Sequence, residues 1–268
     1  MGKNSNSEMT FLEHLEELRW HLIRSAVAIF VFAIVAFIFN EIIFDKIIIF
    51  PKNPDFWTNR MLCRLGGLVN IQKLCINSKP FQLININMAG QFTIHIMVSL
   101  FAGFIIAFPY IMYEFWKFIT PALYTTERRY ARGTVFYTSV LFILGVLFGY
   151  YLIVPLSVHF LGSYHVSGQV INQINLKSYI ATVISVCAAS GAIFELPVLI
   201  YFLSKIGLIT PQFLKKYRKH AIIIILTLAA IITPPDIFSQ ILVSLPLIVL
   251  YEISIYISKK ITDKKKEE

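Results

Sequence analysis

Residues 133–155 read GTVFYTSVLFILGVLFGYYLIVP, a stretch without any Asp, Glu, Lys or Arg. A helix needs about 20 mostly apolar residues to cross the roughly 30 Å hydrocarbon core of a bilayer. This stretch is long enough, and comparable stretches recur along the chain. The six candidate spans lie near residues 22–39, 92–113, 133–155, 179–203, 221–233 and 237–257. The sequence therefore predicts an all-α, polytopic membrane protein with six transmembrane helices.

The composition of the 268-residue chain agrees with this prediction. Hydrophobic residues make up 57% of the chain and charged residues 15%, and the mean hydropathy is +0.69. Soluble proteins carry about 25% charged residues, so this composition excludes an ordinary soluble enzyme, a disordered chain and a disulfide-rich miniprotein. The net charge of +9 suits either a nucleic acid or an anionic membrane face.

The positions of the basic residues predict the orientation, because cytoplasmic loops are enriched in Lys and Arg. Basic residues gather between the second and third spans, between the fourth and fifth, and in the tail 258–268. The opposite side carries only scattered charges, most of them in a long first loop, 40–91. Both termini should therefore be cytoplasmic. The positive excess then reflects membrane topology, and no nucleic-acid partner is expected.

The fifth candidate span is short, since its 13 residues at about 1.5 Å each reach roughly 20 Å. Pro234, Pro235 and Asp236 separate it from the sixth span. Two successive prolines prevent a continuous helix, and Asp236 can cap the helix that follows. These three residues therefore predict the turn of a tight helical hairpin.

Residues 1–21 predict an amphipathic helix on the cytoplasmic side and lack the features of a cleavable signal peptide. Its apolar stripe consists of Phe11, Leu15, Leu18 and Leu22. Glu13, Glu16 and Glu17 face away from that stripe. These acids are either solvated or receive a cationic peptide, and composition alone favours solvation.

Glu195 is an acid inside the fourth span, about eight residues from its cytoplasmic end. A carboxylate in the membrane costs about 2.5–3.5 kcal/mol, so it should face protein or water, or be protonated. Two interpretations are equally compatible with the sequence. One is a buried acid that is hydrogen-bonded within the bundle, and the other is a contact with a partner or substrate.

Cys63 and Cys75 both fall in the long first loop. On an oxidising external side they can form a disulfide, which contributes about 3 kcal/mol by the chain-entropy relation. Two free thiols are the alternative. The sequence has no metal-ligand spacing, nucleophile motif or phosphate-binding loop, so we expect no catalytic residue, no metal, no cofactor and no enzymatic activity.

Four stretches, in this order along the chain, resemble the TatC family, the polytopic subunit of the twin-arginine protein translocase. They are residues 11–19 (FLEHLEELR), 118–129 (FITPALYTTERR), 194–197 (FELP) and 233–240 (TPPDIFSQ). The resemblance implies a concave, glove-like bundle of six helices in the bacterial inner membrane. It also implies a receptor for the signal peptides of folded precursors, in a translocase driven by the proton-motive force.

The resemblance assigns the signal-peptide site to four residues. Glu17 and Glu127 would bind the two signal arginines, and Arg19 and Phe118 would shape the pocket. A carboxylate binds a guanidinium through charge-assisted and often bidentate hydrogen bonds, which lysine does not reproduce. Taken by itself, Glu127 lies beside arginines and is also compatible with a local ion pair, which contributes little when exposed.

The resemblance also implies protein partners in the membrane. Glu195, Thr233 and Gln240 would contact single-span proteins of the TatA and TatB type, and further copies of the chain would join the complex. The alternative function is a proton- or ion-coupled secondary transporter that uses Glu195 as its ion site. A visible internal repeat, which many such transporters have, is missing from the sequence.

Overall fold

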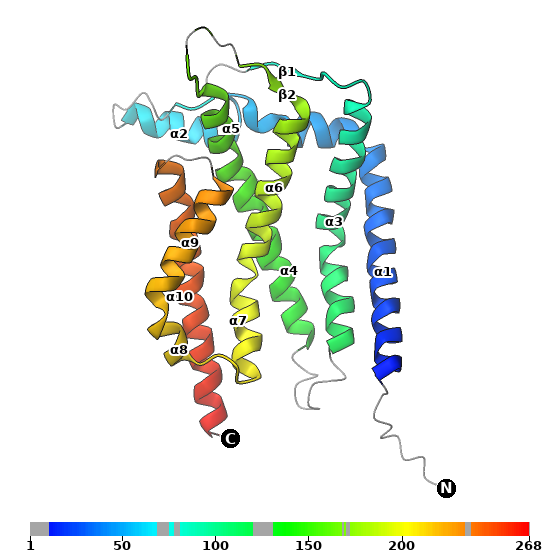
Figure 1. The fold of residues 1–268 in the computed structure, drawn as a ribbon, viewed down its shortest axis with the longest axis vertical. Coiled ribbons are helices and arrows are strands. Elements are labelled where there is room, and N and C mark those ends of the chain that lie inside the picture. Colours follow the sequence, from blue (N-terminus) through cyan, green and yellow to red (C-terminus); the bar gives the residue numbers. More distant parts are fainter. Residues whose placement is uncertain are drawn as a thin grey trace. The chain divides into compact units, whose positions relative to one another are not determined.

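Long helices rich in Ile, Leu, Val and Phe make up most of the structure, a computed structural model (Figure 1). The structure describes residues 11–68, 75–77, 81–119, 131–167, 169, 172–233 and 237–267. Within these residues, five helical segments are long and apolar enough to cross a membrane. They are Leu15–Ile38, Gly90–Ile119, Gly133–Ser163, Leu176–Lys205 and Gln240–Asp263. The predicted all-α membrane fold is therefore confirmed, while the six-span topology with both termini in the cytoplasm stays a prediction.

Helix α1 (Phe11–Ile38) joins the N-terminal amphipathic stretch to the first predicted span without a break. The structure thus makes one helix of segments that the sequence suggested as two. The second span is α3 (Gly90–Ile119), which is 30 residues long and contains Pro109. At about 1.5 Å per residue this helix is about 45 Å long, so it exceeds the hydrocarbon core.

The chain divides into two compact units, which comprise residues 1–38 with 99–139, and 39–98 with 140–268. In the first unit, α1 and α3 approach closely at Gly103. A Cβ atom at this position would lie 2.6 Å from the backbone nitrogen of Ala33 and 2.7 Å from the carbonyl oxygen of Ile29. Only glycine permits this contact, which is a common use of small residues between membrane helices.

In the second unit, the third span consists of α4 (Ala131–Phe148, which begins in the first unit), a π-helical segment η6 (Gly149–Ile153) and α5 (Val154–Ser163). The fourth span consists of α6 (Leu176–Phe194) and α7 (Leu196–Lys205). The two spans pack closely, because a Cβ at Gly145 would lie 2.6 Å from the carbonyl oxygen of Ser190.

The last helices are α8 (Pro211–Lys216), α9 (Arg218–Ile232) and α10 (Ile237–Glu267). Helix α9 has 15 residues and is therefore only about 22 Å long, in agreement with the short fifth span expected from the sequence. An ion pair joins α9 to α10, with 2.6 Å between Arg218 Nε and Glu252 Oε1. The turn residues Pro234, Pro235 and Asp236 lie outside the described residues.

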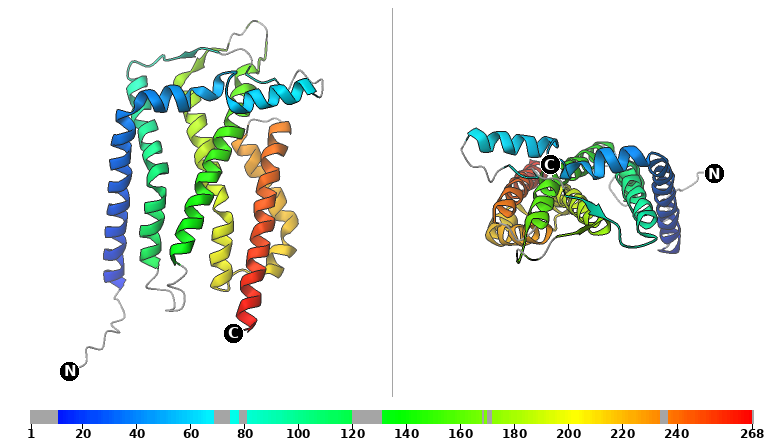
Figure 2. Two further views of the ribbon diagram at one scale, coloured as in Figure 1. Left: turned by 180° about the vertical axis from the view of Figure 1, so that it is seen from behind. Right: turned by 90° about the horizontal axis from the view of Figure 1, so that it is seen from above.

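The first loop, 40–91, contains regular structure that the sequence did not predict. Its elements are a π-helix η1 (Ile42–Ile48), a 3₁₀-helix η2 (Phe50–Lys52), α2 (Trp57–Leu68) and β1 (Leu83–Ile84). Strand β1 pairs in parallel with β2 (Ile174–Asn175), with Leu83 opposite Ile174. Figure 2 shows α2 running across the direction of α5 and α10 in the same unit.

A buried pair of asparagines holds this loop to the third span. The Asn59 amide donates to the carbonyl oxygens of Pro51, at 3.0 Å, and Asn53, at 2.7 Å. Asn77, which has a φ of 52°, donates from Nδ2 to the carbonyl oxygen of Pro155 at 3.1 Å. Buried amides that are satisfied in this way fix the path of an irregular segment.

Cys63 and Cys75 form a disulfide in the structure, with 4.0 Å between their Cα atoms. Cys63 lies in α2, and Cys75 follows the gap 69–74. The bond therefore closes a loop of about a dozen residues, and it lies on the same segment as the asparagine pair.

Candidate functional site

Glu114, near the end of α3, is an acid with 3% of its surface exposed. His21 of α1 donates a hydrogen bond from Nδ1 to the Glu114 carboxylate at 2.5 Å. Arg24, on the next turn of α1, places Nη1 3.7 Å from the same carboxylate oxygen. A buried carboxylate needs hydrogen bonds and opposite charge to offset its lost hydration, and α1 supplies both.

Helical spacing brings further side chains to this cluster. Glu17 precedes His21 by four residues on α1, and Phe118 follows Glu114 by four residues on α3, so each lies on the same helical face as its neighbour. The rings of His21 and Phe118 make an edge contact, with 6.0 Å between their centroids. The polar cluster is therefore closed on one side by an aromatic ring.

A cavity of about 500 Å³ opens beside the cluster. It is lined by Glu16, Glu17, Trp20, His21, Arg24 and Lys117. Glu16 is exposed and Glu17 is half-buried, and neither carboxylate has an ion-pair partner among the described residues. The arrangement can receive a cationic group, since the charge of Glu114 is neutralised within the chain while that of Glu17 is not.

The predicted signal-peptide residues are only partly brought together. Glu17 lines the cavity, and Phe118 contacts the cluster through His21. Arg19 is exposed on α1 and is not among the described residues that line the cavity. Glu127 lies outside the described residues. The part of the assignment that the structure describes therefore rests on Glu17 and Phe118.

Sequence reasoning did not single out His21, Arg24 or Glu114. A usable signal was present, because Glu114 directly follows the predicted second span and His21 directly precedes the first. An acid and a base at the same ends of neighbouring spans are candidates for an interhelical pair. The sequence alone did not show that α1 and α3 are neighbours at this level.

Glu195 lies at the junction of α6 and α7, where the helix is interrupted before Pro197. Its backbone N–H donates to the carbonyl oxygen of Ala192 at 3.2 Å. The side chain is half-buried, and its Oε1 atom has no hydrogen-bond partner among the described residues. The Oε1 atom itself is buried, so a partner from outside the chain can reach only the exposed part of this side chain.

Thr233 and Gln240, at the ends of the hairpin, both use hydrogen bonds within the chain. The hydroxyl of Thr233 is buried and donates to the carbonyl oxygen of Ala229 at 2.8 Å. Gln240 donates from Nε2 to the carbonyl oxygen of Leu226 at 3.1 Å, which ties α10 to α9. These bonds leave Gln240 Oε1 and one amide hydrogen as the polar groups best able to meet a partner.

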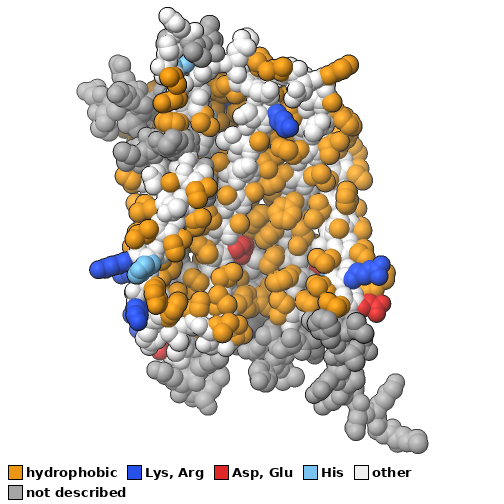
Figure 3. Space-filling view, in the orientation of Figure 1, with side chains coloured by type: hydrophobic (Ala, Val, Ile, Leu, Met, Phe, Trp, Pro, Cys, Tyr) orange, Lys and Arg blue, Asp and Glu red, His pale blue; other side chains and the backbone are white. Residues whose placement is uncertain are grey.

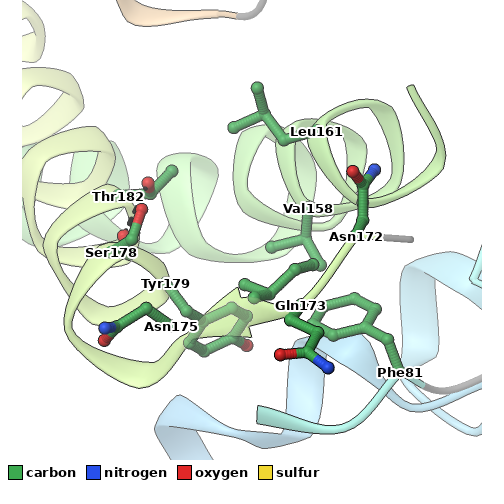
Figure 4. A pocket seen from close by; sticks show the side chains of 11 residues that line it. Phe81, Val158, Leu161, Asn172, Gln173, Asn175, Ser178, Tyr179 and Thr182 are labelled. Atoms are coloured by element: carbon green, nitrogen blue, oxygen red, sulfur yellow. Dashed lines mark hydrogen bonds between the residues drawn. The ribbon is translucent and has the colours of Figure 1, made fainter. Parts of the chain in front are cut away.

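A second cavity, of about 540 Å³, lies between α5, α6 and the strand pair (Figure 4). Phe81 and Tyr179 contribute aromatic rings, while Ser178 and Thr182 add hydroxyls from α6. None of the described residues that line it carries a charge. The Tyr179 hydroxyl donates to the carbonyl oxygen of Ile48 in the first loop. We therefore assign this cavity to the packing between the first loop and the helices.

Comparison with known proteins connects this arrangement to one family. The family described as Sec-independent protein translocase protein (TatC) matches residues 13–246. A TatC protein of Blattabacterium from Periplaneta americana is 44% identical, over 98% of this chain and all of the relative. A TatC protein of Aquifex aeolicus is 37% identical, over 97% of this chain and 98% of the relative.

A crystal structure of a twin-arginine translocase receptor TatC in the detergent DDM is also similar. It covers 92% of this chain and 100% of its own, with a TM-score of 0.69 and 35% sequence identity. The surface of the chain suits a membrane, because the face in Figure 3 is covered mainly by hydrophobic side chains. The chain belongs to the TatC family and is therefore a multi-pass membrane component of the Sec-independent, twin-arginine protein translocase, and not an enzyme.

Proposed function

We propose that the chain is the receptor that binds twin-arginine signal peptides within this translocase. The observation that carries the proposal is the cavity beside α1 and α3, in which Glu17 has no ion-pair partner among the described residues. A guanidinium entering this cavity would find a carboxylate, and the aromatic face of Trp20 can stack on it. Glu127 is the second carboxylate in this proposal and takes the second arginine.

The His21–Glu114 pair gives the cavity its selectivity in this proposal. Because Glu114 already accepts a hydrogen bond from His21 and pairs with Arg24, an incoming arginine does not have to compete for a buried acid. Lys117 lines the same cavity and repels cations that are not held by a carboxylate. The signal peptide must therefore offer bidentate groups that match the carboxylates of Glu17 and Glu127, which favours arginine over lysine.

The remaining parts of the proposal concern topology and assembly. Both termini lie in the cytoplasm of a bacterial inner membrane, and the proton-motive force drives export. Glu195 contacts a single-span partner of the TatA or TatB type, because its half-buried side chain lies where the fourth span is interrupted between α6 and α7. Further copies of the chain join the active complex. Membership of the TatC family argues against the alternative of a secondary transporter.

Site-specific photocrosslinking tests the receptor proposal. A photoreactive amino acid replaces Glu16, which lines the cavity, and the protein is mixed with a labelled twin-arginine peptide. We expect a crosslink that unlabelled twin-arginine peptide competes away and a twin-lysine peptide does not. Glu17→Ala/Glu127→Ala should abolish the crosslink.

The matched control removes two acids elsewhere, as Glu41→Ala/Asp45→Ala, which are exposed at the other end of α1 and in η1. This control should crosslink as strongly as the unsubstituted protein. Undiminished crosslinking by the Glu17/Glu127 variant would refute the receptor assignment, provided that the variant inserts and elutes normally.

A further inference from the structure

Helix α2 exposes an apolar stripe that the proposed receptor function does not use. Trp57 is 63% exposed and Leu68 is 83% exposed, and Met61 and Leu65 are exposed between them. Positions i, i+4, i+8 and i+11 lie on one face of a helix. Residues on other faces are buried against the rest of the second unit, namely Thr58, Asn59 and Gly66.

Two arginines flank this stripe. Arg60 and Arg64 lie one turn apart, both exposed, and neither has an ion-pair partner among the described residues. They line a cavity of about 530 Å³ with Phe50, Asp55, Trp57, Met61 and Leu65. The lining has two positively charged guanidinium groups and one negatively charged carboxylate, that of Asp55. Its net charge is therefore positive, which favours an anion.

The anchor of α2 places it close to a membrane boundary. The Thr58 hydroxyl donates to the carbonyl oxygen of Tyr151, and the Phe56 ring stacks on the Tyr151 ring at 5.6 Å between centroids. Tyr151 follows Gly133 by 18 residues along the third span, which corresponds to about 27 Å. The candidate span continues for 12 residues beyond Tyr151 to Ser163, so α2 leaves the bundle in the half of this span nearer the first loop.

The direction of α2 agrees with this depth. Within the second unit α2 runs across the direction of α5 and α10 and extends beyond them (Figure 2). A helix that lies parallel to the membrane plane at this depth presents one long side to lipid. The disulfide and the Asn59 hydrogen bonds fix the opposite side, so the stripe cannot turn inward.

We propose that α2 is an interfacial helix that binds anionic phospholipid in the leaflet next to the first loop. The apolar stripe lies at the boundary between headgroups and acyl chains, with Trp57 at its edge. Arg60 and Arg64 bind a lipid phosphate, since the planar guanidinium group matches phosphate bidentately. The charge of the cavity and its position at the boundary favour lipid over a second protein as the occupant.

Quenching of Trp57 fluorescence by brominated lipids tests this proposal on the full-length protein. The protein is reconstituted in phosphatidylcholine vesicles that contain 6,7-dibromo acyl chains on either phosphatidylglycerol or phosphatidylcholine, at equal mole fraction. The chain has three tryptophans, and the difference between the unsubstituted protein and Trp57→Phe isolates the signal of Trp57.

Brominated phosphatidylglycerol should quench Trp57 at a lower mole fraction than brominated phosphatidylcholine. One basic group near an anionic lipid corresponds to about a fivefold preference. Arg60→Gln/Arg64→Gln should remove the preference while quenching by phosphatidylcholine persists. Lys215→Gln/Lys216→Gln removes the same charge from α8 and should leave the preference unchanged.

Three results would overturn the proposal. Absence of quenching by both lipids would mean that solvent or another protein, such as a second copy of the chain, covers the stripe. Equal quenching by the two lipids in the unsubstituted protein would exclude an anionic site, and this comparison needs no arginine variant. A preference that survives Arg60→Gln/Arg64→Gln would assign the selectivity to other residues.

Discussion

The imidazole of His21 and the carboxylate of Glu114 lie 2.5 Å apart and join α1 to α3 beside the cavity that contains Glu17. Two acids near this pair differ in burial and in their partners. Glu114 is buried and neutralised within the chain, whereas Glu17, one helical turn from His21, lacks an ion-pair partner among the described residues. An acid paired within the chain and the acid proposed to bind the signal peptide thus lie at the same end of the α1–α3 pair.

Replacing His21 by Ala should lower the free energy of unfolding by about 1–3 kcal/mol, because it removes the closest hydrogen bond to a buried carboxylate. Thermal unfolding in detergent measures the change. Arg24→Gln should have the smaller effect, since Arg24 is 3.7 Å from Glu114 and its side chain is 48% exposed. The His21→Ala protein unfolding at the same temperature as the unsubstituted protein would contradict a stabilising role for the pair.

Replacing Gly103 by Ala should destabilise the protein, because the added Cβ would lie 2.6 Å from a backbone nitrogen of α1. Overpacking of this kind costs about 1–3 kcal/mol, as the two helices must separate. Gly133→Ala is the matched control, since no atom of the described residues outside its own helical turn lies within 4 Å of its Cβ position. The prediction fails if both variants have the same melting temperature in detergent.

The cysteines make a prediction for thiol chemistry. Cys63 and Cys75 should resist alkylation until reductant is added, and Cys187 should resist it in the folded protein throughout because it is buried. Mass spectrometry of the alkylated protein counts the modified residues. Labelling of Cys63 and Cys75 without reductant would show that the native protein carries free thiols. Cys63→Ser/Cys75→Ser should cost about 3 kcal/mol of stability by the chain-entropy relation.

Glu195 should act through hydrogen bonding if it contacts a partner helix. Glu195→Gln keeps a polar group of the same shape and should retain crosslinking to single-span partners, whereas Glu195→Ala should lose it. The supporting observation is that the Glu195 side chain is half-buried at the interruption between α6 and α7. Equal crosslinking and equal export by all three proteins would favour a purely structural role for this acid.

The spans could be predicted from the sequence because lipid permits only a few backbone arrangements. The short α9 was anticipated from its length and from the two prolines that follow it. The continuous α1 was not anticipated. The change from charged to apolar residues near position 21 resembles the boundary between two helices, although no residue there breaks a helix. The interruption at Glu195 matches the position of Pro197, which suits the first turn of a new helix.

The candidate site was predicted less completely than the spans. Glu17 and Phe118 followed from the resemblance to the family, and both lie next to His21 in the structure. The His21–Glu114 pair could not be foreseen, since it joins residues 93 positions apart and depends on which spans are neighbours. The helices and the strand of the first loop were not predicted, because hydrogen bonds of buried amides such as Asn59 hold them in place. The pattern of apolar residues does not indicate such bonds.

The central claim is that Glu17 binds an arginine of the signal peptide. A double-mutant cycle tests it, with affinities measured for the unsubstituted protein and Glu17→Ala against a twin-arginine peptide and peptides in which either arginine is glutamine. A charge-assisted hydrogen bond predicts a coupling energy of about 1.5–3 kcal/mol between Glu17 and one of the two arginines, and none for Glu16→Ala. If Glu17→Ala weakens all three peptides by the same factor, the coupling is zero and the claim is contradicted.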